Sequence, residues 1–198
     1  ILLSVVEPLS TGRDMRDIGL GLCGRVELGR DWALEDGFAV VNGEGANTAD
    51  TTPKKDVFGR VGLVRGKWLR LGLSAASVEF RRDDATVERS TRAGADLGVE
   101  RGPVRVLAEY ARGWYVKPGA GTAWAFYGAA IVRVADGVDL LGRYEQRDPA
   151  WDGERLRYVT AGATYTHEKL GARLQLNYRH GLEAKAGDLL LLQGQYVF

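Results

Sequence analysis

The chain contains 198 residues, and its 27 Lys and Arg residues nearly balance its 26 Asp and Glu residues. This balance leaves no basic surface that would indicate nucleic-acid binding. Hydrophobic residues make up 45% of the sequence and the mean hydropathy is -0.20, with no run of the roughly 18 apolar residues that a membrane-spanning helix needs. The length suits one barrel or sandwich, so we expect a single domain over residues 1–198.

The first residues of the chain lack the features of a signal peptide. Residues 1–8 carry no initiating Met, no basic segment and no small-residue cleavage site. We therefore expect either that a signal has been removed or that the sequence begins partway through a longer protein. Residues 1–6 are interpreted as the remnant of an earlier strand.

Alternating apolar and polar residues predict about eleven strands, arranged as strand, short turn, strand and longer polar loop. The expected strands are residues 18–28, 32–41, 56–64, 68–78, 89–100, 104–114, 122–133, 138–147, 156–166, 172–180 and 188–198. Short turns lie at residues 29–31, 65–67, 101–103, 136–137 and 168–171. The longer loops are residues 42–53, 81–88, 117–121, 148–154 and 183–187.

The tenth expected strand gives the clearest assignment of faces. Leu174, Leu176 and Tyr178 alternate with Arg173, Gln175, Asn177 and Arg179. Strands of about ten residues with one apolar face can cross a bilayer at a tilt. A soluble sandwich is the alternative, since many soluble antiparallel sheets alternate in this way. Short turns at one end and longer loops at the other favour an antiparallel transmembrane β-barrel of the bacterial outer membrane.

Aromatic residues are expected at both ends of these strands. Trp32 and Trp68 lie beside short turns, whereas Trp114, Trp124 and Trp151 lie near longer loops. The final strand ends with two aromatic residues, as a closing barrel strand does at the membrane interface. We therefore predict that the membrane-interface residues include Trp32, Trp68, Trp114, Trp124, Tyr196 and Phe198.

Strand direction indicates that further strands complete the barrel. If the short turns face the periplasm, the strand at residues 18–28 and the final strand run the same way. A closed antiparallel barrel of this kind needs an even number of strands. At least one strand must then precede residue 18, and another chain or an earlier segment must complete the closure.

The sequence contains the short motifs Gly12-Arg13-Asp14, Arg16-Asp17-Ile18-Gly19-Leu20, Val41-Asn42-Gly43-Glu44-Gly45-Ala46-Asn47 with Asp50, Lys55-Asp56-Val57-Phe58-Gly59-Arg60-Val61, Gly142-Arg143-Tyr144-Glu145 and Leu176-Asn177-Tyr178 before Phe198. In these motifs the chain resembles the phosphate-selective porin O/P family. The resemblance implies a barrel of about sixteen strands, of which this chain is similar to the carboxyl-terminal portion. It also implies passive diffusion of anions such as phosphate through a water-filled lumen. The constricting loop of the family would lie before Ile1, so it is not carried over.

The lumen face expected from the alternation carries charges of both signs. Opposite charges on neighbouring strands can pair and stabilise the sheet, whereas an anion path needs arginines that remain free to attract a solute. Both roles stay open at this point. The predicted pore-lining residues are Arg25, Arg60, Arg70, Arg105, Glu109, Arg143, Glu145, Arg173 and Arg179.

Two other classes of function, an enzyme and a structural barrel, are alternatives to a channel. Only His167 and His180 could act as a base at neutral pH, and neither has the spacing to a nucleophile such as Ser90 that would specify a triad. No catalytic residue, metal ligand or cofactor is therefore assigned, and we expect a protein that is not an enzyme. A structural barrel within an outer-membrane assembly is the second alternative. The expected partners are outer-membrane lipid, small anions or other small solutes, and a homotrimer or larger membrane assembly.

Overall fold

In the computed structural model, the described residues are 19–42, 54–83, 86–115, 122–148 and 155–196. They form one antiparallel sheet of eleven strands, in which every strand pairs with its neighbours in sequence. The expectation of an all-β antiparallel fold is confirmed. The strands are β1 (Gly19–Gly29), β2 (Trp32–Val41), β3 (Asp56–Arg65), β4 (Leu69–Asp83), β5 (Thr86–Arg101), β6 (Val104–Tyr115), β7 (Thr122–Ala135), β8 (Val138–Asp148), β9 (Leu156–His167), β10 (Ala172–Gly181) and β11 (Leu189–Tyr196).

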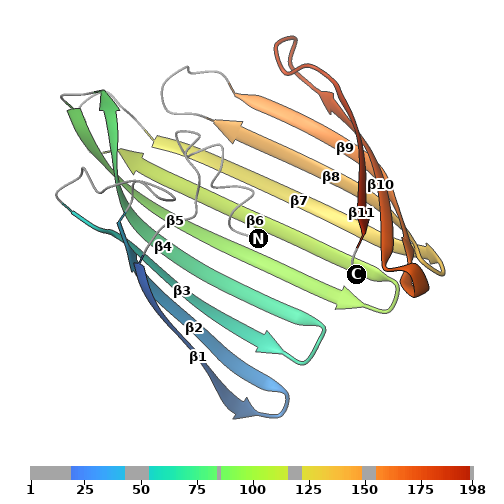
Figure 1. Ribbon diagram of the computed structural model, residues 1–198, viewed down its shortest axis with the longest axis horizontal. Coiled ribbons are helices and arrows are strands. Elements are labelled where there is room, and N and C mark those ends of the chain that lie inside the picture. Colours follow the sequence, from blue (N-terminus) through green and yellow to red (C-terminus); the bar gives the residue numbers. More distant parts are fainter. Residues whose placement is uncertain (1–18, 43–53, 84–85, 116–121, 149–154, 197–198) are drawn as a thin grey trace.

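The sheet is twisted and curled, and β1 and β11 form its two edges (Figure 1). Within the described ranges each edge strand is paired on one side only. The eleven strands therefore have the order and directions expected for consecutive barrel strands, while both edges are left open for further pairing.

One predicted loop is wrong in its extent. Residues 81–88 were expected to form a polar loop, but β4 and β5 continue into this segment and leave only residues 84–85 outside the description. The backbone pairs Phe80↔Glu88, Arg81↔Val87 and Asp83↔Thr86 extend the ladder, with a register shift between Arg81 and Asp83. Inter-strand hydrogen bonds thus continue where the polar composition alone favoured a loop.

The short turns adopt conformations that bring successive strands together closely. Arg30 and Asp31 both have positive φ, 51° and 65°, as a two-residue type I′ hairpin turn requires. Gly66 and Gly102 supply positive φ at the next two turns. The turn after β9 is a 3-10 helix, η2 (Glu168–Leu170), in which the His167 side chain accepts a hydrogen bond from the Leu170 amide.

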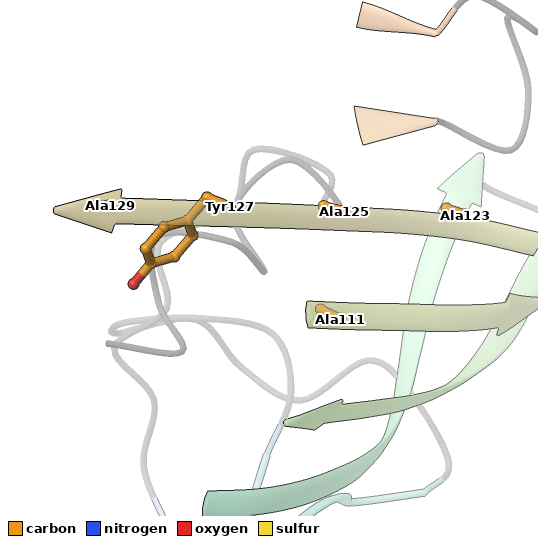
Figure 2. Close-up of a cluster of buried hydrophobic side chains, with 5 residues drawn as sticks. All are labelled: Ala111, Ala123, Ala125, Tyr127 and Ala129. Carbon is orange, nitrogen blue, oxygen red and sulfur yellow. The ribbon is translucent and has the colours of Figure 1, made fainter. Parts of the chain in front are cut away.

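The strand register places the side chains on two contrasting faces. The charged face carries Arg60, Asp96 and Glu109 together with a buried cluster, which consists of Ala111, Ala123, Ala125, Tyr127 and Ala129. Figure 2 shows this cluster, with three alanines and Tyr127 along β7 and Ala111 on β6. Along β7 the buried residues alternate with more exposed ones, as period-two packing of a strand predicts.

The opposite face is apolar and exposed. Its large hydrophobic side chains include Leu22, Leu73, Phe126, Leu176 and Leu192, and Leu22 remains 79% exposed. Soluble monomers rarely expose contiguous apolar patches of more than a few hundred Å². Among the described residues, no helix is long and apolar enough to cross a membrane.

Candidate functional site

The candidate site is the charged face, because the register forms one row across nine strands, with polar side chains on seven of them. Directly paired positions run in the order Arg25, Glu35, Gly62, Gly72, Asp96, Glu109, Tyr127, Glu145 and Tyr158. Paired residues share a face, so residues far apart in sequence meet here. Within the described ranges, no group of three or more His, Cys, Asp and Glu side chains is placed to hold a metal ion.

The β3–β6 part of the face contains an ion pair that is buried on the side of its carboxylate. Arg60 donates to Asp96 through two hydrogen bonds, Nη1 to Oδ2 at 2.5 Å and Nη2 to Oδ1 at 2.8 Å. Gly72 lies on β4, between β3 with Arg60 and β5 with Asp96. A Cβ atom at Gly72 would collide with both of these side chains. Next to Asp96 in the row, Glu109 is only 1% exposed. This part of the face therefore holds the Arg60 guanidinium in a bidentate pair with Asp96.

Arginines and tyrosines alternate on the β7–β10 part of the face. The Arg143 Cζ lies 4.5 Å from the Tyr127 ring centroid, and the Arg143 Nε lies 3.1 Å from the Glu145 carboxylate. The Cζ atoms of Arg147 and Arg179 lie 5.7 Å and 4.5 Å from the ring centroid of Tyr158. Stacking on an aromatic ring restricts a guanidinium without neutralising its charge.

Arg147 and Arg179 form no ion pair with any carboxylate in the part of the chain that the structure describes. Among the described residues Arg147 is partnered by Tyr158 alone, through its ring and through a 3.4 Å contact from Nη2 to the tyrosine hydroxyl. The positive charge that remains unneutralised on the face is therefore concentrated on β8 and β10.

The other predicted pore-lining residues lie on the same face but differ in their partners. Arg25 pairs with Glu27 and Glu35, and Arg105 pairs with Glu100. Arg70 lies 3.9 Å from the Glu35 carboxylate. Arg173 is exposed, and none of the described carboxylates pairs with it. The described arginines on this face thus differ in their surroundings, with cross-strand ion pairs for most of the predicted ones and no carboxylate partner for a few.

The residues predicted from the sequence for the charged face did not include Arg147 or Tyr158. Arg147 follows Arg143 and Glu145 at period two, which was the signal available for placing it on the same face. The position of Tyr158 between Arg147 and Arg179 depends on the pairing of β8, β9 and β10. That arrangement has no local signature in the sequence.

Each of the two histidines lies at or near the end of a strand and contacts the turn or loop that follows. His167 caps η2, and His180 Nδ1 lies 2.9 Å from Asp188 Oδ1. Ser90 is on β5 and His180 is on β10, and these strands do not pair. The described structure therefore does not assemble a serine, a histidine and a carboxylate through neighbouring strands.

Two carboxylates hold the loop between β10 and β11. The Tyr178 hydroxyl donates to Asp188 at 2.6 Å and the Gly181 amide donates to it at 3.2 Å. These donors, the tyrosine first, hold the pKa of Asp188 below its usual range. Hydrogen bonds from Arg157 likewise lower the pKa of Glu183 at the start of the loop.

We expect acid to release the Asp188 contacts. A carboxyl group whose pKa is lowered by folding stabilises the folded loop above its ordinary pKa and loses that contribution as pH falls through the lowered value. In the Asp188→Asn variant at neutral pH, the Gly181 amide should exchange with solvent faster than in the wild type. Hydrogen-exchange mass spectrometry, corrected for the intrinsic pH dependence of exchange, should show that this difference disappears in acid. A difference of the same size at acid pH would contradict the role of the charge.

Most of the predicted interface residues lie near strand ends. Trp32 begins β2, Trp68 precedes β4, Trp114 lies near the end of β6, Trp124 lies near the start of β7, and Tyr196 ends β11. Trp124 stacks with Tyr110 at a centroid distance of 6.4 Å. Trp151 and Phe198 lie outside the described residues. Contact of these aromatic side chains with a membrane stays a prediction.

The fold is similar to that of a solved porin. The anion-selective porin from Comamonas acidovorans aligns with a TM-score of 0.63 and 12% sequence identity, covering 88% of this chain and 54% of the porin. The chain thus spans about half the length of the porin that it matches. No family model matches the sequence, and no curated protein matches it. The structural similarity shows that the eleven strands have a porin-like arrangement.

Proposed function

We propose that the protein is a porin-type channel of the bacterial outer membrane, through which small solutes, and preferentially small anions such as phosphate, diffuse passively. The observation that carries this proposal is the contrast between the two faces of one sheet. One face is charged and the other exposes large apolar side chains, which is the arrangement of a barrel with a polar interior and a lipid-facing exterior. The similarity to an anion-selective porin supports the same proposal.

The proposal also requires that the sheet closes into a barrel. An open sheet edge in lipid leaves backbone donors and acceptors without partners. Since β1 and β11 are each paired on one side within the described residues, the proposed barrel requires further strand pairing at both edges. A total of about sixteen strands would match the porins, including the phosphate-selective porin O/P family that the sequence motifs resemble. A homotrimer or larger assembly in outer-membrane lipid is part of this proposal.

A structural barrel within an outer-membrane assembly is the second candidate. The carboxylate partners of Arg25, Arg60 and Arg105 favour it, because paired charges stabilise a wall without attracting solutes.

Conductance of the full-length protein in planar bilayers separates the two candidates. We expect discrete current steps and, under a potassium chloride gradient, a reversal potential of the sign given by excess chloride permeability. Folded, inserted protein without current would support the structural barrel, and a cation-selective current would overturn the anion preference.

A further inference from the structure

Arg65 lies between two tryptophans at the short-turn end of the sheet. It ends β3 and pairs directly with Trp32 at the start of β2, while Trp68 lies in the turn that follows β3. The Arg65 Cζ is 5.1 Å from the Trp32 ring centroid and 5.3 Å from that of Trp68. The guanidinium therefore contacts two indole rings at once.

The charge of Arg65 has no anionic partner within the described part of the chain. The side chain is exposed, and Trp68 is 43% exposed beside it. Contacts with indole rings leave the five N–H donors of a guanidinium without oxygen acceptors. Such a planar group suits bidentate binding of phosphate oxygens.

The position of Arg65 combines an apolar surface with a polar turn. Along β3, Val61 and Leu63 share its face, and Val61 is 51% exposed. On the turn side of Arg65, the exposed cations Arg30 and Lys67 lie in two neighbouring turns. The Gly66 amide of one turn donates a hydrogen bond of 2.7 Å to the Asp31 carbonyl of the other. A ligand here would meet cations at one end and hydrocarbon at the other.

We propose that Trp32, Arg65 and Trp68 form a binding site for the phosphate of a glycerophospholipid at the short-turn rim of the barrel. The proposal rests on the membrane insertion assumed in the proposed function. The phosphate accepts hydrogen bonds from Arg65, and the side chains of Arg30 and Lys67 add positive potential. The indoles occupy the interfacial region. An acyl chain runs along Val61 and Leu63. A free phosphate would use the cations, but neither the interfacial indoles nor the apolar surface along Val61 and Leu63.

Arg101 provides a matched control. It ends β5 on the same face and precedes a similar short turn containing Gly102. The side chain is also exposed, but it contacts none of the described aromatic rings. The two arginines thus match in charge and in position at a short turn, whereas Arg101 lacks the paired indoles that contact Arg65.

The test is lipid binding by the full-length protein, measured by native mass spectrometry after titration with phosphatidylglycerol in detergent. Arg65→Gln is expected to weaken binding about fivefold, the scale of one interfacial cation, whereas Arg101→Gln is expected to bind like the wild type. Diacylglycerol with the same chains should bind more weakly than phosphatidylglycerol, and inorganic phosphate should not displace the lipid. Arg65→Lys, which keeps the charge without the planar fork, is expected to bind at least twofold more weakly and serves if Arg65→Gln does not fold.

Equal binding by the folded Arg65 variant and the wild type would overturn the site, as would equal losses in the Arg65 and Arg101 variants. Equal binding of diacylglycerol would overturn recognition of the phosphate. Displacement of the lipid by inorganic phosphate would assign the site to free phosphate instead. The same preparations are tested for conductance, so a wild type that binds the lipid but carries no current would contradict the channel and leave the lipid site standing.

Discussion

Replacing Gly72 with valine is expected to lower the free energy of unfolding by about 2–4 kcal/mol. A Cβ atom at Gly72 would collide with the Arg60 guanidinium and the Asp96 carboxylate, so the ion pair would have to open. The side chain of Asp96 is only 6% exposed, whereas that of Arg60 is 36% exposed. Opening a buried pair costs about 3–5 kcal/mol, and solvent at Arg60 reduces this figure. Urea unfolding of the full-length protein in lipid vesicles, followed by tryptophan fluorescence, measures the loss.

Gly37→Val is the control for this substitution. Gly37 pairs directly with Arg60 on the same face, yet a Cβ atom there would meet nothing within 4 Å. Valine also suits a strand better than glycine, so this variant should unfold at a urea concentration equal to or above that of the wild type. Equal stability of the two variants would show that the ion pair does not contribute as described.

If the protein is the proposed anion-preferring channel, neutralising Arg147 and Arg179 together is expected to reduce its anion preference about fivefold to tenfold. These two guanidinium groups stack on Tyr158 and have no carboxylate partner in the described ranges. Each unit charge contributes about 1 kcal/mol to the energy of an ion about 4 Å away in water. Two such contributions correspond to about a thirtyfold change, which screening by salt reduces to the expected range. The ratio of chloride to potassium permeability, obtained from reversal potentials of Arg147→Gln/Arg179→Gln, measures the change.

A charge-conserving pair of substitutions distinguishes charge from packing. Arg147→Lys/Arg179→Lys loses the stacked guanidinium groups but retains both positive charges, so its permeability ratio should stay close to that of the wild type. If the glutamine variant has the wild-type ratio as well, these arginines do not carry the selectivity. If the lysine variant loses the preference to the same degree, the geometry of the arginines determines it instead of their charge.

The strand pattern could be predicted from the sequence because alternation is a local property. The expected strand at residues 138–147 agrees closely with β8 (Val138–Asp148), and the turn glycines Gly66 and Gly102 lie where the short turns occur. The predicted loop at residues 81–88 failed because polar residues also occur in paired strands. Composition alone therefore misjudged where the β4–β5 hairpin ends.

The partners of individual charges could not be predicted, because they depend on register between distant segments. Arg60 and Asp96 are 36 positions apart and meet across Gly72 on the strand between them. A shift of one residue in either pairing would move the side chains to opposite faces. The sequence therefore predicted arginines on this face but did not distinguish the paired Arg60 from the uncompensated Arg179.

The most direct test of a water-filled channel lined by the charged face uses Cys23, the single cysteine of this sequence. Cys23 is exposed and pairs with Gly37, so it lies on the charged face of β1. A charged methanethiosulfonate reagent is added to full-length protein conducting in a planar bilayer. We expect a stepwise change in single-channel current on modification, and none in the Cys23→Ser variant. Modification of Cys23 without any change in current, or labelling only after unfolding, would contradict the assignment of this face to the lumen.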